Sequence, residues 1–367
     1  MNLQLHDLRR VFRQYGSAVY HGAEGRFDRL VPIAYRAARA RLKYGIGPIP
    51  FSVLQLATVP EGRWLDYVFD NNDFKRDLQR MSPPEMHRLA YNKVLFFEHC
   101  LRQGLPAIAI ICRVGGSPDP LGTVVPHADS VERFKAILQS APERLFIKPI
   151  DGAHAEGAFL ALHAEGRCEF LPHEREQTLE GLYHYLQDQQ DDHSGFIVQR
   201  QERPHETMKP FASASALPSV RVVTVSAKDG PRILFACLKI PVGSSISDNF
   251  SDGAGGNLLA GVDIETGILT AARGSLRKDW PVMVTRETHP DTGHLITGSR
   301  LPLWDSIAEL ALRAQASVPR FKSVGWDIAP TETRVVLIEA NSGYDMSVLQ
   351  VAHRRGLKAE LAAGLAL

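Results

Sequence analysis

The segment RFKSVGWDIAPTETRVVLIEANSGY, residues 320–344, is the part of the chain that decides the fold. Two apolar runs flank a short polar turn, which predicts a β-hairpin. Asp327 lies in the first strand, and Glu339 and Asn341 lie in the second. Because side chains alternate across a strand, Glu339 and Asn341 project from the same face. Asp327 joins them if the turn around Thr331–Thr333 has an odd number of loop residues.

Two interpretations of this hairpin are open from these residues alone. Carboxylate and amide oxygens converging from a rigid hairpin are the ligands that Mg²⁺ takes in octahedral geometry. Acidic residues also end strands for purely structural reasons, and a D…E-x-N pattern by itself does not distinguish the two. The rest of the chain has to decide between them.

Length and composition indicate a soluble globular protein. The chain has 367 residues, of which 44% are hydrophobic and 23% charged, which suits two or three packed subdomains. A formal net charge of +1 gives no general drive toward nucleic acid or membrane. There is no apolar run of membrane-spanning length and no secretory signal at the start, so we expect a cytoplasmic location.

Cysteine and nucleophile patterns exclude several site classes. The four cysteines form no C-x-x-C pair, so we expect small buried or partly buried thiols rather than a zinc site or disulfide framework at Cys100, Cys112, Cys168 and Cys237. Ser275 to Lys278 spells S-x-x-K, but the companion motifs of serine acyl-enzymes are missing.

Residues 1–45 are predicted to be helical and basic, with nine Lys or Arg against three Asp or Glu. Apolar residues keep helical spacing from Leu30 through Ile33 to Leu42. A solvated basic face is the expected role of this region. Docking to an anionic membrane surface or an acidic partner is the alternative.

The middle of the chain predicts a small α+β unit. A helical pattern over 86–104 contains Lys93, and a strand over 108–114 follows it. A helix capped by Asp129 or Ser130 precedes strands over 144–150, 158–163, 168–172 and 195–201, with a helix around 179–186. These elements predict a small antiparallel sheet with a helix laid on it.

The second half predicts another antiparallel sheet. Apolar strands are expected over 218–227, 232–242, 257–264 and 268–273, before a helix over 302–316 and the opening hairpin. The segment 242–256 is too polar and glycine-rich to be core. A final helix is expected from about Met346 onward.

Lysine is scarce, with 11 residues against 31 arginines, so a lysine inside an apolar element is notable. Lys148 lies within the strand FIKP, directly before the glycine-bearing loop DGAHAEG. This combination suits phosphate, because glycine lets backbone amides approach the oxygens while lysine supplies a point charge. A snorkelling lysine followed by a hairpin turn is the alternative. Neither a P-loop nor a G-x-G-x-x-G motif occurs.

The order of these parts resembles the ATP-grasp superfamily, and more closely its sugar-transfer-associated branch. The resemblance covers residues 85–355 and rests on FIKP with its glycine loop, SVRVVT, DNFSDGAGGNLLAGVDIETG, GWDIA and LIEANSGYD. It implies an α+β ATP-grasp fold, in which two α+β subdomains grip ATP between antiparallel sheets. The subdomains expected are a helical region over 1–84, a lid over 85–205 and a C-terminal subdomain over 206–367. Many ligases of the superfamily begin instead with a parallel α/β domain.

The resemblance also implies a role for each matching residue. Lys93 and Lys148 would contact nucleotide phosphates, beneath the loop from Gly152 to Gly157. Strand residues up to Gln199 would face adenine, with Glu202 near the ribose and Arg200 departing from the usual hinge residue. Arg221 would face the transferred phosphate or the acceptor. The acceptor pocket would comprise Asn249, Gly255, Gly256 and Asn257. One or two Mg²⁺ ions, or Mn²⁺, would be held by Asp327, Glu339 and Asn341.

The activity implied is an ATP-dependent carboxylate–amine ligase. A substrate carboxylate would form an acylphosphate that an amine then attacks, on a sugar-derived, cell-surface or specialised-metabolite precursor. Lys148, Arg221 and the metal would supply the cations that a transferring phosphoryl group needs. A phosphotransferase acting on a hydroxyl or sugar is one alternative, and a non-catalytic nucleotide-binding module is another.

Overall fold

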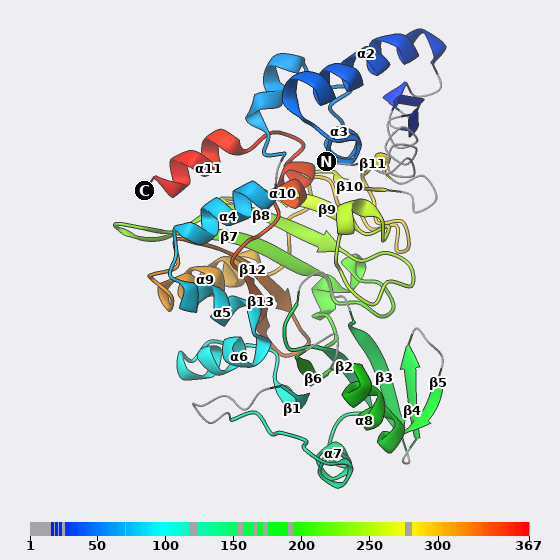
Figure 1. Cartoon of the computed structure of the whole chain (residues 1–367), viewed down its shortest axis with the longest axis vertical. Coiled ribbons are helices and arrows are strands. Elements are labelled where there is room, and N and C mark those ends of the chain that lie inside the picture. The colour runs from blue at the N-terminus through cyan, green and yellow to red at the C-terminus, as the bar shows by residue number, and fades with distance from the viewer. Residues whose placement is uncertain are drawn as a thin grey trace, which may run out of the picture.

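Two antiparallel sheets form the body of the molecule (Figure 1). The computed structural model describes residues 16–17, 19–20, 22–23, 26–69, 71–116, 124–152, 157–164, 167–171, 175–189, 194–275 and 281–366. The strand order is β1-β6-β2-β3-β4-β5 in the smaller sheet and β11-β10-β9-β8-β7-β12-β13 in the larger one. Both sheets match the α+β ATP-grasp fold that the sequence predicts.

The smaller sheet is built from short strands and has apolar clusters on both faces. Its strands are β1 (Ile110–Gly115), β2 (Arg144–Pro149), β3 (Phe159–Ala164), β4 (Arg167–Leu171), β5 (Arg175–Thr178) and β6 (Gly195–Arg200). Helices α7 (Val131–Leu138) and α8 (Leu179–Asp188) share one apolar core with it. The hydroxyl of Ser130 accepts a hydrogen bond from the Arg133 amide, so Ser130 is the N-cap of α7.

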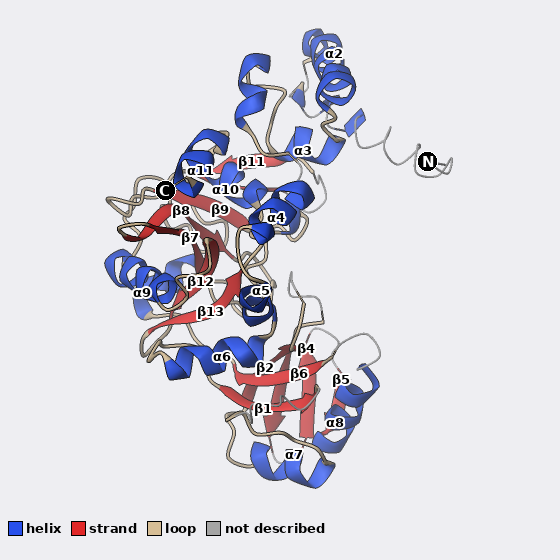
Figure 2. Cartoon of the chain, turned by 60° about the vertical axis from the view of Figure 1, so that its left-hand side comes forward, coloured by secondary structure: helices blue, strands red, loops and turns tan. Residues whose placement is uncertain are grey.

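The larger sheet has apolar cores on both faces. Its strands are β7 (Ser219–Ala227), β8 (Gly230–Ile240), β9 (Leu258–Val262), β10 (Ala272–Ser275), β11 (Met283–Arg286), β12 (Ser323–Pro330) and β13 (Val335–Asn341). Helix α9 (Trp304–Ala316) contacts β7, β8 and β12 on one face. On the other face α10 (Met346–His353) contacts β8 and β9, and α11 (Lys358–Leu365) contacts β7 and β8. Figure 2 shows α9 on the opposite side of this sheet from α10 and α11.

The predicted helix over 86–104 is two helices. Asn92 has an extended backbone, and its side chain accepts hydrogen bonds from the amides of Val94 and Leu95. It therefore ends α5 (Pro84–Tyr91) and caps α6 (Lys93–Arg102), which places Lys93 at the first position of a helix. Both helices contact β13 of the larger sheet, although the predicted boundary at 84 groups them with the lid. The subdomain boundaries themselves stay a prediction.

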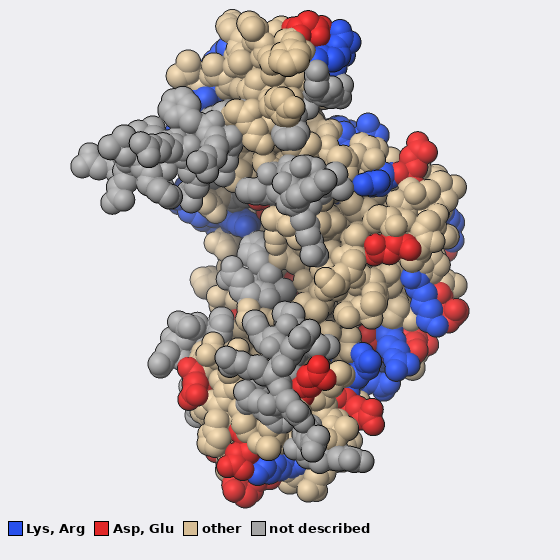
Figure 3. Space-filling view, turned by 90° about the vertical axis from the view of Figure 1, so that its right-hand side faces the viewer, with Lys and Arg blue, Asp and Glu red and all other residues tan. Residues whose placement is uncertain are grey.

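The helical N-terminal region is confirmed where the structure describes it. It contains α2 (Phe27–Tyr44), α3 (Pro48–Val53), the 3-10 helix η1 (Glu61–Asp66) and α4 (Asn71–Arg80). Ile33, Ala37 and Ala40 of α2 are buried, but Leu42 is 87% exposed, so the predicted apolar spacing fails at Leu42. Among the helices of the described residues, none is long and apolar enough to cross a membrane. Acidic and basic side chains are interspersed on the face in Figure 3. Membrane contact stays a prediction.

The β12–β13 hairpin reaches the predicted arrangement by a different route. Pro330 pairs with Val335, so the turn comprises residues 331–334, an even number. A β-bulge between Asp327 and Ile328 shifts the register, and Asp327 pairs directly with Glu339. Directly paired residues share a face of the sheet. The bulge therefore brings Asp327 onto the same face as Glu339, which the even-numbered turn alone would not do.

Gly325 of β12 packs against the side chain of Tyr344, which leaves no room for a Cβ atom. A Cβ atom there would lie 2.9 Å from the Cβ of Tyr344. We expect Gly325→Ala to lower the free energy of unfolding by about 1–3 kcal/mol through overpacking, measured by urea denaturation. Gly62→Ala is the matched control, because its Cβ would meet nothing within 4 Å. Equal stability of the two variants would contradict this account of the packing.

Candidate active site

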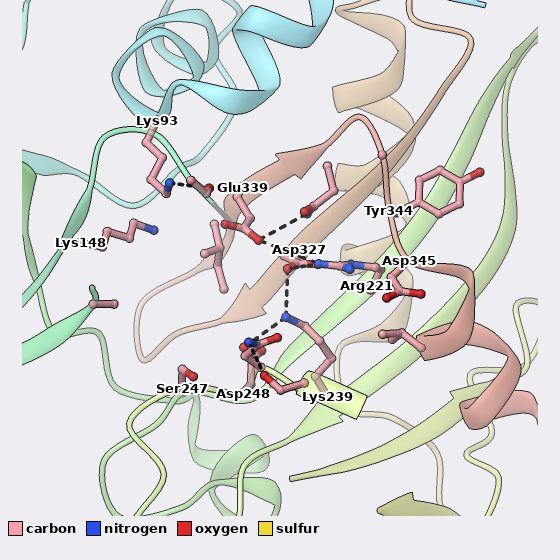
Figure 4. Close-up of a pocket in the computed structure, with 18 of the residues that line it drawn as sticks. Lys93, Lys148, Arg221, Lys239, Ser247, Asp248, Asp327, Glu339, Tyr344 and Asp345 are labelled. Carbon is pink, nitrogen blue, oxygen red and sulfur yellow. Dashed lines mark hydrogen bonds and ion pairs between the residues drawn. The ribbon is translucent and has the colours of Figure 1, made fainter. Parts of the chain in front are cut away.

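A cavity of about 430 Å³ lies against the β12–β13 hairpin, and its lining is rich in charged side chains (Figure 4). This volume is typical of small-molecule sites. The sheets, the 247–252 loop and helix α4 all contribute to its wall. Its charged lining residues are Lys75, Lys93, Lys148, Arg221, Lys239, Asp151, Asp248, Asp252, Asp327, Glu339 and Asp345.

A buried ion-pair network forms the floor of the cavity. Arg221 of β7 donates from Nε and Nη2 to the two oxygens of Asp327, both at 2.7 Å. Lys239 of β8 donates from Nζ to Asp327 Oδ2 at 2.9 Å. Burial alone would raise the pKa of Asp327, but the charges of Arg221 and Lys239 and their hydrogen bonds lower it. Asp327 is therefore ionised and held by two cations.

Asp248 balances the second cation. Lys239 Nζ also donates to Asp248 Oδ1 at 3.1 Å, and the hydroxyl of Ser219 donates to Asp248 Oδ2. Burial lowers the pKa of Lys239, but Asp248 and Asp327 raise it above its ordinary value. Two carboxylates thus neutralise the two cations of the floor.

Glu339 and Asn341 lie beside this network, and each keeps an oxygen that accepts no hydrogen bond from a described residue. The closest cation to Glu339 is Arg221, with Nη2 at 3.9 Å from Oε1. Asn341 Nδ2 donates to Glu339 Oε1 at 3.4 Å and to Gly325 O at 3.3 Å. Within the described part of the chain, no donor bonds to Glu339 Oε2 or Asn341 Oδ1. These two oxygens can accept a ligand.

Lys148 of β2 faces the cavity from the smaller sheet. It is only 7% exposed, and its ammonium forms no hydrogen bond with a described residue. Burial lowers the pKa of Lys148 to about 8 against the attraction of Glu339. Lys93 at the start of α6 donates to the carbonyl oxygen of Gly152 at 3.2 Å, which ties it to the base of the glycine loop. The desolvated ammonium of Lys148 favours an anionic ligand.

The predicted acceptor loop divides into lining residues and a supporting residue. Asn249, Ser251 and Asp252 line the cavity, and Ser251 and Asp252 have positive φ angles of 44° and 52°. Asn257 is buried, and its amide bonds to Val242 N, Ser247 O and Asn249 O. Asn257 therefore shapes the loop without lining the cavity.

Several other predicted residues lie away from the cavity wall. Gln199 is a buried residue of β6 whose amide donates to the carbonyl oxygen of Ile108. The lining of the described cavity contains Gly152 but does not include Gln199, Arg200, Glu202, Gly157, Gly255 or Gly256. Residues 153–156 of the glycine loop lie outside the described residues. The adenine, ribose and loop-closure roles stay predictions.

Three charged residues of the cavity lining were not predicted from the sequence: Lys75, Lys239 and Asp248. Lys239 lies within the apolar strand ILFACLKIPV, so the criterion that selected Lys148 selects it too. Lys75 belongs to the polar helix α4, where a lysine is unremarkable. Its position in the wall depends on how α4 packs beside Gly343, and no local pattern reports that.

Most of the chain matches one protein family. The sequence profile of sugar-transfer-associated ATP-grasp proteins matches residues 71–363. The chain belongs to the sugar-transfer-associated ATP-grasp family. No curated protein matches the sequence. The resemblance named in the sequence analysis is therefore confirmed at the level of the family.

Solved structures similar to this ATP-grasp protein include ligases. The L-amino acid ligase from Bacillus licheniformis is 11% identical with a TM-score of 0.40, covering 76% of this chain and 48% of that chain. This chain thus spans about half the length of that ligase. D-cycloserine synthetase DcsG is 12% identical with a TM-score of 0.40, covering 87% and 82%. The biotin carboxylase domain of the Hydrogenobacter thermophilus 2-oxoglutarate carboxylase, solved with MgADP, ADP and bicarbonate, is 12% identical with a TM-score of 0.38, covering 79% and 52%.

The hairpin offers a magnesium ion two carboxylates and one amide, and no group of three or more Asp, Glu, His or Cys side chains among the described residues is placed to hold a metal. An ionised carboxylate offers about four acceptor positions, and Asp327 uses three of them for Arg221 and Lys239. One position on Asp327 Oδ1 therefore remains, and Glu339, whose Oε2 accepts no bond from a described residue, is the cross-strand partner of Asp327. Mg²⁺ takes few protein oxygens and completes its shell with water and phosphate.

Asp327 and Glu339 should differ sharply in their contribution to stability. We expect Asp327→Asn to lower the free energy of unfolding by about 3–5 kcal/mol, because two buried cations lose their counter-charge. Glu339→Gln should change it by less than about 1 kcal/mol, since the Glu339 side chain is 32% exposed and has no close ion pair. Urea denaturation of both variants measures the difference. Similar losses in the two would refute the assignment of the floor to Asp327.

Lys148 should make nucleotide binding depend on pH. Because its pKa is about 8, Lys148 loses its proton between pH 7 and pH 9, and the affinity for ADP should fall by about tenfold over that range. In Lys148→Arg the cation stays charged, so the fall should disappear. Isothermal titration calorimetry at both pH values measures it. An equal fall in the arginine variant would assign the effect to another group.

Proposed function

We propose that the protein is an ATP- and Mg²⁺-dependent carboxylate–amine ligase that forms an amide through an acylphosphate. The observation that carries the proposal is one cavity holding a desolvated lysine, Lys148, opposite the free oxygens of Glu339 and Asn341. Phosphate and metal requirements meet there, in a chain that belongs to the sugar-transfer-associated ATP-grasp family. The substrates would be a small carboxylic acid and an amine on a sugar-derived, cell-surface or specialised-metabolite precursor.

The first step is a phosphoryl transfer, in which positioning and charge do most of the work. A substrate carboxylate oxygen attacks the γ-phosphorus of ATP, and the bond to the β,γ-bridging oxygen breaks to release ADP. Lys148 and Lys93 hold the phosphate oxygens. Arg221 Nη1 donates to no described residue, so it is available to the transferring group. Held by Glu339, Asn341 and Asp327, Mg²⁺ would neutralise charge on the phosphates.

The second step joins the amine to the activated acid. The amine nitrogen attacks the acyl carbon, the carbon–oxygen bond to phosphate breaks, and the nitrogen gives up a proton. The phosphate dianion that leaves is held by the same cations. Asn249, Ser251 and Asp252 form the wall available to the acceptor. No side chain of the protein needs to form a covalent bond to substrate.

Hydroxylamine trapping tests the proposal. We expect wild-type protein with ATP, Mg²⁺ and pools of carboxylic acids to convert hydroxylamine into hydroxamate. Glu339→Gln should abolish the signal, and Lys148→Met should lower the rate by about 100-fold or more. Glu309→Gln is the matched control, since Glu309 lies on α9, outside the cavity lining, with its side chain 73% exposed.

Other outcomes point to different functions. A stable phosphorylated product without hydroxamate would indicate a phosphotransferase acting on a hydroxyl or sugar. ATP binding without turnover of any acceptor would indicate a nucleotide-binding module. Absence of both binding and turnover would refute the proposal.

A further inference from the structure

A buried arginine that forms no ion pair with a described residue lies in β10 of the larger sheet. Arg273 pairs with Leu259 of β9 and Thr285 of β11, and it is 8% exposed. Cross-strand partners share a face, and Leu259 belongs to the core that includes residues of α3 and α10. The Arg273 side chain therefore projects into the layer between the sheet and these helices.

Among the described residues, Arg273 lacks the carboxylate partners that Arg221 and Lys239 have. Its Nε atom is buried without a hydrogen bond, and Arg273 forms no ion pair with any residue the structure describes. Arg221 and Lys239, by contrast, are each paired with carboxylates. Burial and the positive charge of Arg354 lower the pKa of Arg273 to about 10. Burying an unpaired charge is strongly unfavourable, so an anion is expected beside it.

Two further groups belong to segments packed in the same layer, since α10 contacts β10 and Tyr67 lies in the core beneath them. Arg354 follows α10 in a left-handed conformation, with φ of 58°, and its side chain is exposed without a bond to a described residue. Tyr67 is 6% exposed and belongs to the same apolar core as Leu259, and its neighbour Val68 is joined by backbone hydrogen bonds to the side chain of Gln350 in α10. The C-terminal dipole of α10 favours cations there, but its effect is smaller than the cost of burying one.

We propose that Arg273, Arg354 and Tyr67 form a binding site for a phosphate-type oxyanion, separate from the ATP cavity. Two guanidinium groups match the charge of a dianion better than that of a single carboxylate, and guanidinium forks suit tetrahedral oxyanions. The Tyr67 hydroxyl adds a neutral donor. None of the three residues lines the cavity at the hairpin. The oxyanion is either free phosphate or the phosphoryl group of a larger metabolite.

Thermal unfolding in phosphate tests this site. The background is Lys148→Met, which removes the phosphate-binding lysine of the cavity and makes the test independent of the proposed ligase activity. In that background we expect sodium phosphate to raise the Tm relative to sodium chloride at equal ionic strength. Arg273→Met should abolish the rise and should unfold at a higher temperature in chloride, because an unpaired buried charge is gone.

A second variant keeps the test decisive if Arg273→Met does not fold. Arg354 is exposed, so Arg354→Ala should fold normally and weaken phosphate binding by about tenfold in calorimetry. Arg320→Ala, another exposed arginine, is the control and should bind like the parent. Tighter binding of glycerol 3-phosphate than of inorganic phosphate would identify a phosphorylated metabolite as the source, and the reverse would identify free phosphate. No phosphate-dependent rise in the Lys148→Met background, or an equal rise in Arg273→Met, would overturn the proposal.

Discussion

The buried contact among Arg221, Asp327 and Lys239 is the interaction on which the candidate site depends. These residues come from β7, β12 and β8, which are neighbours in the larger sheet. Removing one partner from such a network leaves a buried charge uncompensated. The network therefore holds three strands in one register and fixes the surface from which Glu339 and Asn341 project. A rigid floor of this kind pre-organises a site for charged ligands.

The charges of the cavity separate into two groups. Arg221, Lys239, Asp327 and Asp248 neutralise one another and are nearly inaccessible. Lys148 and Glu339 form no close contact, and the protein leaves each with unused hydrogen-bonding capacity. The four residues of the network use most of their donors and acceptors on one another, whereas Lys148 and Glu339 keep more of theirs available for a ligand. This difference distinguishes the two carboxylates of the hairpin, although a sequence motif treats them alike.

Much of the fold and part of the site could be predicted from the sequence, because both depend on local patterns. Strand alternation identified the hairpin, and the strand context of Lys148 identified a phosphate-binding candidate. The parity of Asp327 and Glu339 could not be derived, since it depends on a bulge rather than on the turn. Lys75 was also inaccessible to sequence reasoning, because its place in the wall follows from the packing of α4. Asn257 was identified in the correct loop, but its hydrogen bonds support that loop instead of facing the cavity.

Lys148 in the smaller sheet and Arg273 in the larger sheet are both buried cations whose charge needs a counter-charge. Each is a cation more than nine-tenths buried, and neither forms an ion pair with a carboxylate of the described residues. The sequence distinguished Lys148 by its strand context but not Arg273, because the absence of a partner is a property of three-dimensional packing. Helix α10 connects the two environments: its N-cap Asp345 lines the cavity, and the helix contacts β10, the strand that carries Arg273. An anion bound at Arg273 would therefore stabilise the helix whose first turn forms part of the cavity wall.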